Sequence, residues 1–599
     1  MATKPPDHTI KLFEVHIEHF RCLKRAVVRL DDLTVLVGQN NSGKTSFLDA
    51  LALAVGMGRR PFSAEDMFLD SKESVVPKGR VLTIDILIRP VDLKGEVIPT
   101  FPAGSYWLTL WGNGISQDKE DHDFVAVRTQ AKWDKNEGDY ILERRFLGEW
   151  PEDPTTWDGA KTKGEVGFMG IEPLALFLMD AKRDIHEDML ARGSFWQKLV
   201  SDLRLTDKQI ASLEKRLSKL NADIISASKV LRHVQTNIDD VHLALDSAKG
   251  AVSITPTARS LRDLSRGMDV TFATRGSQAF PIDRHGMGTR SLATILTFRA
   301  YTRWREQEKK GKAFHPLLGL EEPEAHLHPQ AQRALFRMIK EFPGQRIIST
   351  HSPYIAAEAE ISQFRYFRKT GAETQIKSID TASLSEDDLR KVNRMVMNTR
   401  GDLIYASALI LVSGETEEQA LPVLGEYYWK RHPNDLGLSV LGVGGDGAYL
   451  PFLRLAKSFS IPWFIFSDGE TDALERVRAA VEEIGEAWPC SRVYEIPGGV
   501  NYEKYIATND YRDALIGMII ALEAKSEQHK KAKEIEWAGF QDPLQKIVDY
   551  MTGNKTKCAK RAAQAIIGIA DEKLRIPKRV RELFEDLGKE CELKGRSSK

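Results

Sequence analysis

The sequence predicts an α/β fold with two domains, the second built on a parallel sheet, and a helical insert inside the first domain. Three observations carry this prediction. An apolar strand, a glycine-rich loop and a helix follow one another within residues 33–53. Apolar residues separated alternately by three and four positions fill residues 210–245, which is typical of one long helix. From residue 408 onward, short apolar strands alternate with helical stretches, which favours a compact parallel α/β domain.

The composition is that of a multidomain protein from a reducing compartment. A chain of 599 residues exceeds what one hydrophobic core can organise. Four widely spaced cysteines form no C-x-x-C pair, which argues against a zinc module or a disulfide scaffold. Residues 1–9 resemble no secretory signal and no long apolar run follows, so we expect a cytoplasmic protein without a membrane segment. Lys plus Arg equal Asp plus Glu at 85 each, so nucleic-acid binding would need a local basic patch.

The expected elements divide the chain into five segments. Alternating apolar residues predict strands within 11–37 and at 81–88, and residues 60–165 predict an antiparallel β-rich part of the first domain. Further strands are expected at 314–320, 346–349, 408–412, 438–443, 463–466 and 492–496, and an amphipathic helix with a charged tail at 576–599. The predicted segments are 1–183 and 251–380 for the first domain, 184–250 for the insert, 381–404 for a polar linker and 405–599 for the second domain.

The insert is expected to pair with another helix. A capping box from Thr206 to Gln209 opens it, and neither Pro nor Gly interrupts the heptad pattern before Gly250. A helix of five heptads is roughly 50 Å long and has an apolar seam that a second helix can cover. The partner is either a preceding helix near 186–204 or a second subunit, and we favour a homodimer, with a higher oligomer left open.

A phosphate-binding loop is predicted at residues 38–45, which match G-x-x-x-x-G-K-[ST]. Between a strand and a helix, the backbone N–H groups of such a loop cradle phosphates, aided by the positive end of the helix dipole. Lys44 would reach the terminal phosphates and Thr45 a magnesium ion. A chance glycine-rich turn is the alternative, which the flanking strand and helix disfavour. The nucleotide-binding residues expected here are Gly38, Asn40, Asn41, Ser42, Gly43, Lys44, Thr45 and Ser46.

A second nucleotide element is predicted where the strand at 317–320 ends in two acids. Glu321 would lie near the magnesium ion and Glu322 would activate a water. His351, which follows the next apolar strand, would contact the terminal phosphate. His326 and His328 are two residues apart, and we favour a structural hydrogen-bonding role for them over a metal pair.

These residues resemble ABC-type ATPases of the SMC/RecF class. The resemblance covers most of residues 10–370 and rests on the segments 17–21, 38–45, 321–329 and 349–353. It implies hydrolysis at a head-to-head dimer, in which a signature loop of one subunit completes the other's site. Our candidate for that loop is 284–291, with Gly286 and Gly288 near nucleotide, although its sequence departs from the usual Ser-Gly-Gly.

Two further points follow from this resemblance. Glu321 stands where the family usually has aspartate, and the extra methylene is expected to shift the metal and slow turnover. Arg183, within the charged segment 180–184, either contacts nucleotide or the subunit interface, or simply begins a solvated helix.

The second domain carries acids at two strand ends. Glu415 and Glu417 follow the strand at 409–412, and Asp468 and Glu470 follow the strand ending at 466. Because the carboxyl ends of parallel strands meet at one edge of a sheet, we expect these acids to lie together. Hard oxygen ligands suit Mg²⁺ or Mn²⁺, and such a metal can activate water and stabilise the departing oxygen of a phosphodiester.

This half resembles a Toprim domain, and the order of domains is similar to the OLD (overcoming lysogenisation defect) family of ATP-dependent nucleases. The family's first Toprim acid normally precedes the glycine, where this chain has Ser413, so Glu417 or Glu415 would have to serve as general base. The family's late lysine is matched by Lys555, with Lys557 as second choice.

The surroundings of that lysine leave two questions open. Lys555, Lys557, Lys560 and Arg561 form a basic cluster that either neutralises phosphates or is a solvated helix face. Glu503 is a further candidate metal ligand.

The sequence therefore predicts an ATP- and Mg²⁺- or Mn²⁺-dependent DNA endonuclease or nickase, acting in phage defence or DNA repair, with an unidentified protein partner left open. The alternative is a non-cleaving SMC-like DNA-binding ATPase with a degenerate Toprim domain. Ser413 favours this alternative, whereas Asp468, Glu470 and Lys555 count against it. A topoisomerase or primase is disfavoured, because we find neither a nucleophilic tyrosine segment nor a zinc module.

Overall fold

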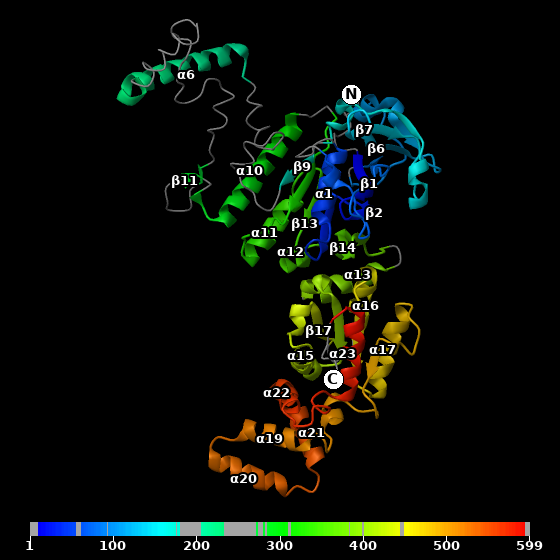
Figure 1. Cartoon of the computed structure of the whole chain (residues 1–599), viewed down its shortest axis with the longest axis vertical. Coiled ribbons are helices and arrows are strands. Elements are labelled where there is room, and N and C mark those ends of the chain that lie inside the picture. Colours follow the sequence, from blue (N-terminus) through cyan, green and yellow to red (C-terminus); the bar gives the residue numbers. More distant parts are fainter. Residues whose placement is uncertain are drawn as a thin grey trace. The chain divides into compact units, whose positions relative to one another are not determined.

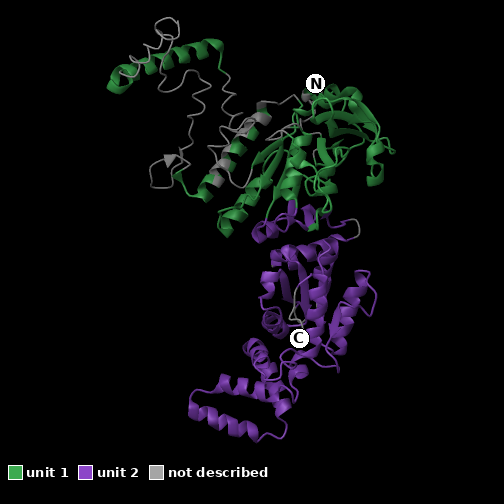
Figure 2. Ribbon diagram, in the orientation of Figure 1, with its two compact units in different colours: residues 1–34, 43–350, 369–374 green, residues 35–42, 351–368, 375–599 purple. Residues whose placement is uncertain are grey.

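The computed structural model divides into two compact units (Figure 2). Unit 1 comprises residues 1–34, 43–350 and 369–374, and unit 2 comprises residues 35–42, 351–368 and 375–599. The structure describes residues 10–55, 62–92, 94–174, 176–179, 205–232, 271–272, 280–281, 284–308, 313–381, 384–397, 400–443 and 448–593.

The expected β-rich part is a seven-stranded antiparallel sheet. Its strands are β1 (Ile10–Phe20), β2 (Leu23–Arg29), β4 (Leu82–Pro90), β5 (Ile115–Gln117), β6 (Asp123–Asp134), β7 (Asp139–Leu147) and β8 (Thr162–Glu165). They lie in the order β2-β1-β4-β6-β7-β8, and β5 pairs with β6. Short helices α2 (Tyr106–Trp111) and α3 (Phe168–Ile171) and the 3-10 turns Ala64–Asp66, Gly112–Gly114 and Pro154–Gly159 connect them. The predicted antiparallel character of residues 60–165 is confirmed.

A six-stranded sheet carries the glycine-rich loop. Its strands are β3 (Leu33–Gly38), β9 (Leu176–Met179), β12 (Leu317–Glu321), β13 (Gln345–Ser349), β14 (Phe364–Thr370) and β15 (Glu373–Lys377), in the order β15-β14-β3-β13-β12-β9. β12 pairs in parallel with β13 and β9, and β14 pairs in parallel with β3. The helices that follow or flank these strands are α1 (Lys44–Ala54), α10 (Met287–Glu308), α11 (Pro329–Lys340) and α12 (Pro353–Glu358). Two short strands, β10 (Thr271–Phe272) and β11 (Phe280–Pro281), form a separate antiparallel pair.

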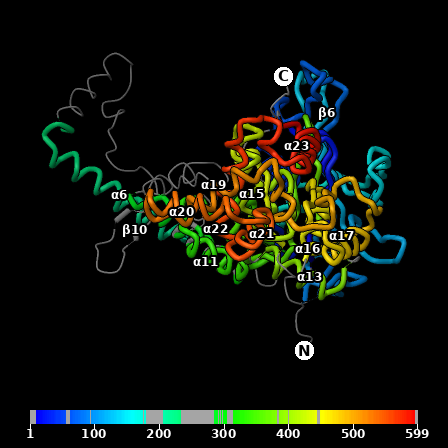
Figure 3. Tube along the Cα trace, turned by 90° about the horizontal axis from the view of Figure 1, so that it is seen from below, coloured from blue at the N-terminus to red at the C-terminus, as the bar shows by residue number. Residues whose placement is uncertain are grey.

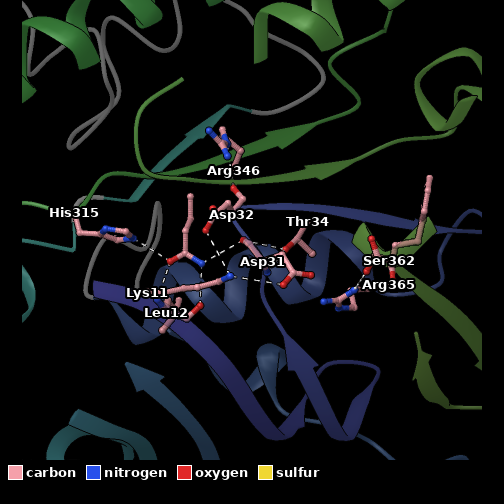
Figure 4. Close-up of polar contacts among 11 residues, drawn as sticks. Lys11, Leu12, Asp31, Asp32, Thr34, His315, Arg346, Ser362 and Arg365 are labelled. Carbon is pink, nitrogen blue, oxygen red and sulfur yellow. Dashed lines mark hydrogen bonds and ion pairs between the residues drawn. The ribbon is translucent and has the colours of Figure 1, made fainter. Parts of the chain in front are cut away.

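One buried glutamine joins the antiparallel sheet to the six-stranded sheet. The amide of Gln345 on β13 accepts from Leu12 N (2.7 Å) and donates to Leu12 O (2.9 Å), so it pairs with the backbone of β1. Its Oε1 also contacts His315 Nε2 at 2.9 Å, and its Nε2 donates to Asp31 O at 3.3 Å (Figure 4). Since burying an unpaired amide is costly, these bonds fix one relative position of the two sheets.

The insert contains a shorter helix than expected. α6 (Asp207–Ala227) begins with the predicted capping box, in which the Thr206 hydroxyl accepts from Gln209 N. It ends at Ala227 because Ser228 adopts an extended conformation, and the Ser228 hydroxyl caps a new turn by accepting from Leu231 N at 3.2 Å. The prediction of one uninterrupted helix is therefore wrong at Ser228, since a serine side chain can compete for backbone N–H groups. Residues 184–204 and 233–250 lie outside the described residues.

The segment expected to be a polar linker is folded. α13 (Glu386–Val392) is followed by a π-helical turn (Asn393–Met397) and a 3-10 turn (Gly401–Tyr405). Val392, Val396 and Met397 are fully buried. Asp388 of α13 forms a 2.5 Å ion pair with Arg454. Charged and apolar residues are about equally frequent here, and several of the apolar residues are buried, so the segment packs as part of unit 2.

The second sheet of parallel strands has the order β17-β16-β18-β19 (Figure 1). Its strands are β16 (Ala408–Val412), β17 (Leu438–Gly442), β18 (Trp463–Ser467) and β19 (Val493–Glu495). All three pairings are parallel, as the alternation of strands and helices predicted. The helices between them are α15 (Glu415–Trp429), α16 (Tyr449–Ser458) and α17 (Thr471–Glu483), and α18 (Tyr502–Ile506) follows β19. A 3-10 turn (Pro433–Leu436) precedes β17.

A group of four helices follows α18 and appears in orange to red in both views (Figures 1 and 3). They are α19 (Arg512–Glu523), α20 (Glu527–Ala538), α21 (Pro543–Gly553) and α22 (Lys555–Ile567). α22 packs against α15 and α19, which attaches the group to the sheet domain. The expected amphipathic C-terminal helix is α23 (Lys578–Glu590), which packs on β18 and β19. No described helix combines the length and the apolar composition that crossing a bilayer would require.

Candidate functional site

The loop at 38–45 has the backbone that its glycines permit. Gly38 has a φ of 142°, and a Cβ there would lie 2.1 Å from Phe367 O. Gly43 has a φ of 99°, and a Cβ there would lie 2.8 Å from Cys22 Sγ. α1 begins at Lys44 with Gly43 as its N-cap, so the first N–H groups of the helix are left for an anion.

The structure places Lys44 among carboxylates. Lys44 is buried, with 6% of its surface exposed, and burial lowers the pKa of its ammonium to about 8. The charges of Glu322 and Glu324 oppose that shift, which places both acids within electrostatic reach of Lys44. Glu324 is buried too, and the Thr350 hydroxyl donates to its Oε1 at 2.7 Å. Sequence reasoning missed Glu324, although it is the third acid of the same short motif.

The other expected nucleotide residues lie at strand ends. Glu321 is the last residue of β12, and Glu322, with a φ of 41°, donates its N–H to Ser349 O at 2.9 Å. His351 follows β13, and its ring stacks on that of Tyr405 with centroids 5.9 Å apart. His328 is the N-cap of α11 and accepts from Ala331 N, so the structural role favoured for it is confirmed.

The candidate signature loop packs within its own unit. α10 begins at Met287, and a Cβ on Gly288 would lie 2.7 Å from His326 O. Gly288 therefore lets α10 approach the loop that follows the acids of β12. Gly286 faces open space. The charged segment 180–184 falls outside the described residues.

The acids of unit 2 surround one cavity of about 550 Å³ at the carboxyl ends of β16 and β18. It is lined by Ser413, Gly414, Glu415, Glu417, Glu418, Gly442, Tyr449, Asp468, Glu470, Ala473, Arg476 and Lys555. The three glutamates of α15 come from its first turn, and Asp468 and Glu470 come from the turn after β18. The structure thus brings all four expected metal ligands of this domain to one place.

Two of these acids hold protons more tightly than usual. Glu417 is 3% exposed, and burial together with the nearby Asp468 charge raises its pKa to about 8. Burial also raises the pKa of Asp468 to about 6, with added repulsion from Glu503 and Glu470, although Tyr502 N donates to Asp468 Oδ1 at 2.9 Å. Negative charge is therefore confined here in excess, and a divalent cation bound by these oxygens would relieve the repulsion. In this respect the residues fit Mg²⁺ or Mn²⁺.

The carboxylates line the cavity without already converging on one point. No group of three or more His, Cys, Asp or Glu side chains within the described ranges has metal-binding geometry. Glu415, Glu417, Asp468 and Glu470 are nevertheless all oxygen donors, the type that Mg²⁺ and Mn²⁺ prefer.

Ser413 connects the two strand ends. Its hydroxyl accepts from Asp468 N at 3.1 Å and lies 3.2 Å from the hydroxyl of Tyr449. Tyr449 is buried at the start of α16, and burial raises the pKa of its phenol, which therefore stays neutral. At the position where the resemblance led us to expect an acid, this chain therefore has the neutral hydroxyls of Ser413 and Tyr449, and that of Ser413 binds the backbone N–H of Asp468.

Lys555 lies at the rim of the cavity. It is the first residue of α22, and its Nζ is 3.5 Å from Oε1 of Glu503. Glu503 is buried and also accepts from the Thr416 hydroxyl at 2.7 Å, so it is a structural partner of both neighbours. Lys557 is exposed and does not line the cavity.

Sequence reasoning missed three polar side chains of this cavity. Glu418 follows Glu417 and forms a 3.0 Å ion pair with Arg400. Tyr449 and Arg476 come from helices that the sheet topology brings to the same edge. The sequence around Tyr449 and Arg476 contains no recognisable motif. The only indication in the sequence was that Arg476 lies in the helix that follows Glu470.

Two family models match different parts of the chain. A model of the AAA ATPase domain matches residues 11–132 and 180–356, and a model of the overcoming lysogenization defect protein-like Toprim domain matches residues 404–469. An OLD nuclease of Thermus scotoductus is 23% identical over 76% of this chain and 81% of its own. The Old nuclease of Escherichia phage P2 is 22% identical over 77% of each chain.

Among solved structures, the C-terminal region of the Burkholderia pseudomallei OLD protein matches 31% of this chain and 99% of its own, with 17% identity and a TM-score of 0.24. The model of the ATPase domain matches the N-terminal part of the chain and the model of the Toprim domain matches the C-terminal part, which is the predicted order of the two domains. The two relatives match along most of their length. The chain therefore carries an AAA ATPase domain followed by an OLD-like Toprim domain, and it is homologous to proteins named OLD nucleases.

Proposed function

We propose that this protein hydrolyses ATP and cleaves or nicks DNA with a divalent metal. One observation carries the nuclease part: buried acids with raised pKa values surround a cavity that has a lysine at its rim. Carboxylates with strongly shifted pKa values cluster at functional sites. The relatives from Thermus scotoductus and phage P2 are named nucleases, which supports the same assignment.

In this proposal Glu415, Glu417, Asp468 and Glu470 hold Mg²⁺ or Mn²⁺. The bound metal would supply Lewis acidity toward a phosphodiester. Lys555 at the rim neutralises a phosphate oxygen, and Glu417, the most buried of these acids, accepts the proton of the attacking water. Ser413 keeps Asp468 in place from its backbone.

The ATPase part uses the loop at 38–45. Lys44 and the first N–H groups of α1 bind the phosphates, Thr45 and Glu321 hold Mg²⁺, and Glu322 orients the water. His351 contacts the terminal phosphate, and Gly286 and Gly288 of a second subunit complete the site. In this proposal ATP is therefore hydrolysed in a homodimer. The proposal also places the protein in the cytoplasm and gives it a role in phage defence or DNA repair.

The test is the separability of the two sites. Lys44→Ala is expected to abolish ATP hydrolysis, and Asp468→Ala to abolish nicking of a supercoiled plasmid with ATPase activity intact. Both are measured with Mg²⁺ and with Mn²⁺, in the presence and absence of ATP. Loss of ATPase activity in the Asp468 variant would contradict the two-site proposal.

The second candidate function is a DNA-binding ATPase that does not cleave. Ser413 favours it, because a hydrogen-bonding serine occupies the position of the family's first acid. Absence of plasmid cleavage with either metal, combined with retained DNA binding and ATP hydrolysis, would favour this second function.

A further inference from the structure

The turn that follows β12 has an unusual backbone at Glu322. Its φ of 41° is in the positive range that residues other than glycine rarely adopt. Pro323 comes next, and a residue before proline favours an extended conformation instead. The conformation of Glu322 is therefore costly and persists only because neighbouring contacts fix it.

Two backbone hydrogen bonds hold Glu322. Its N–H donates to Ser349 O at 2.9 Å, which ties it to the last residue of β13. Its C=O accepts from Ala325 N at 3.0 Å, which closes a β-turn with Pro323 in the second position, where the fixed φ of proline is favourable. These two bonds fix the beginning and the end of the turn, and the third residue of the turn is Glu324.

The side chain of Glu324 attaches the turn to the end of β13. Glu324 is buried, and its Oε1 accepts from the hydroxyl of Thr350 at 2.7 Å. Thr350 is fully buried and directly follows β13. A buried carboxylate is costly unless hydrogen bonds and cations compensate it, and the ammonium of Lys44 lies within electrostatic reach. We call Glu324 and Thr350 the anchoring pair.

The anchoring pair restrains a turn whose first residue has a proposed role in the reaction. Glu322 is the residue assigned to orient the attacking water, and its strained backbone gives it other conformations to relax into. A displacement of about 1 Å in a reacting group can cost about 10²-fold in rate. A side-chain bond two residues from Glu322 can therefore control the rate through the orientation of Glu322.

We propose that Glu324 and Thr350 are positioning residues for ATP hydrolysis, which hold Glu322 in the orientation from which it acts on the attacking water. This inference rests on the proposed role of Glu322. The competing role is that Glu324 itself acts on the water. The bond to Thr350 favours positioning, because it already engages Oε1 of Glu324.

The experiment measures ATP hydrolysis by the full-length protein with Mg²⁺, and the Kd of a fluorescent ATP analogue. Thr350→Val removes the hydroxyl with little change of shape and is expected to lower kcat about 10-fold or more, with less than about a twofold change in KM. Thr350→Ser restores a hydroxyl and should recover most of the lost rate. The matched control Thr302→Val removes another buried hydroxyl of unit 1, which donates to Phe298 O at 3.1 Å, and should leave kcat unchanged.

A Glu322→Gln background shows whether the anchoring pair acts through Glu322. There, Thr350→Val should lower the single-turnover rate by less than about twofold, because the residue that the pair orients has already lost its function. A further loss of about 10-fold in that background would overturn the proposal. So would a wild-type kcat in Thr350→Val, or an equal loss of kcat in Thr302→Val.

Two other outcomes would also contradict the proposal. Glu324→Gln keeps an oxygen for the Thr350 hydroxyl, so a kcat lower than that of Thr350→Val would show that Glu324 acts on the water itself. A rise in KM and Kd as large as the fall in kcat would show general damage to the nucleotide site. Failure of the proposed function gives a different result: the wild type then hydrolyses no ATP, or Glu322→Gln keeps the wild-type rate.

Discussion

Among the acids of the cavity, Glu417 has the pKa that its surroundings raise most strongly. Its pKa in the folded protein is about 8, against an ordinary value of 4.5, because it is buried beside Asp468. Between these two pH values the folded protein holds a proton that the unfolded chain has released. Metal-free protein is therefore stabilised at low pH and loses this stabilisation as the pH rises through about 8.

We expect the melting temperature in EDTA to fall between about pH 5 and 8, and to fall less in Glu417→Gln, which has no proton to lose. Glu415→Gln, at the exposed start of the same helix, is the control and should keep the wild-type slope. A wild-type pH dependence in the Glu417 variant would show that other groups cause it.

A second prediction concerns the buried ion pair of the antiparallel sheet. Asp85 and Arg128 are 0% and 3% exposed, and their two hydrogen bonds measure 2.8 and 2.6 Å. Asp85→Ala leaves the guanidinium buried without its partner and should lower the free energy of unfolding by about 3–5 kcal/mol in denaturant titrations. Glu482→Ala, which removes an exposed partner of Arg478, should change it by less than about 1 kcal/mol.

The residues that sequence reasoning identified are those whose signal is local. The loop at 38–45 and the acids after β12, β16 and β18 each lie within one short segment, so spacing alone predicts their chemistry. Tyr449 and Arg476 share the cavity with those acids only because the topology of the sheet brings separate helices to one edge. The spacing of residues along one sequence does not reveal that these side chains lie close together.

At the scale of elements, the helical insert shows what a heptad pattern determines. The pattern predicted the apolar seam of α6. Whether the helix continues depends on which groups accept hydrogen bonds from its backbone N–H groups, and at Ser228 the serine hydroxyl accepts from Leu231 N instead. The segment 381–404 shows the converse. Its charges predicted a linker, whereas buried apolar side chains, including Val392 and Val396, pack it into unit 2.

The seam of α6 leads to a prediction about assembly. Leu217 is buried, but Leu220 remains 49% exposed in the single chain, and we expect a second subunit to cover it. Leu220→Glu should therefore weaken or abolish the dimer in sedimentation measurements, while Lys219→Glu, on the solvated face, should not. An unchanged mass for the Leu220 variant would place the dimer contact elsewhere.

For the whole molecule, the order of the two domains was more informative than the total charge. A net charge of zero offered no hint of nucleic acid, because 85 acidic and 85 basic residues balance over the whole chain, whatever surfaces they lie on. The motifs, in contrast, follow one another in the order that the family models recognise. The four helices α19–α22 escaped prediction as a group, since their apolar faces show helices but not how those helices associate.

Gln345 has a consequence for how the chain is made. It pairs with the backbone of Leu12, 333 residues earlier, and so joins the first strand of the ATPase domain to a strand near its end. A ribosome adding about 5–20 residues per second needs roughly 15 to 70 s to produce the second partner after the first. During that interval the backbone N–H and C=O of Leu12 lack this side-chain partner, although β2 and β4 already flank β1. The nascent ATPase domain must therefore be shielded, or fold through an intermediate, until its C-terminal strands have been synthesised.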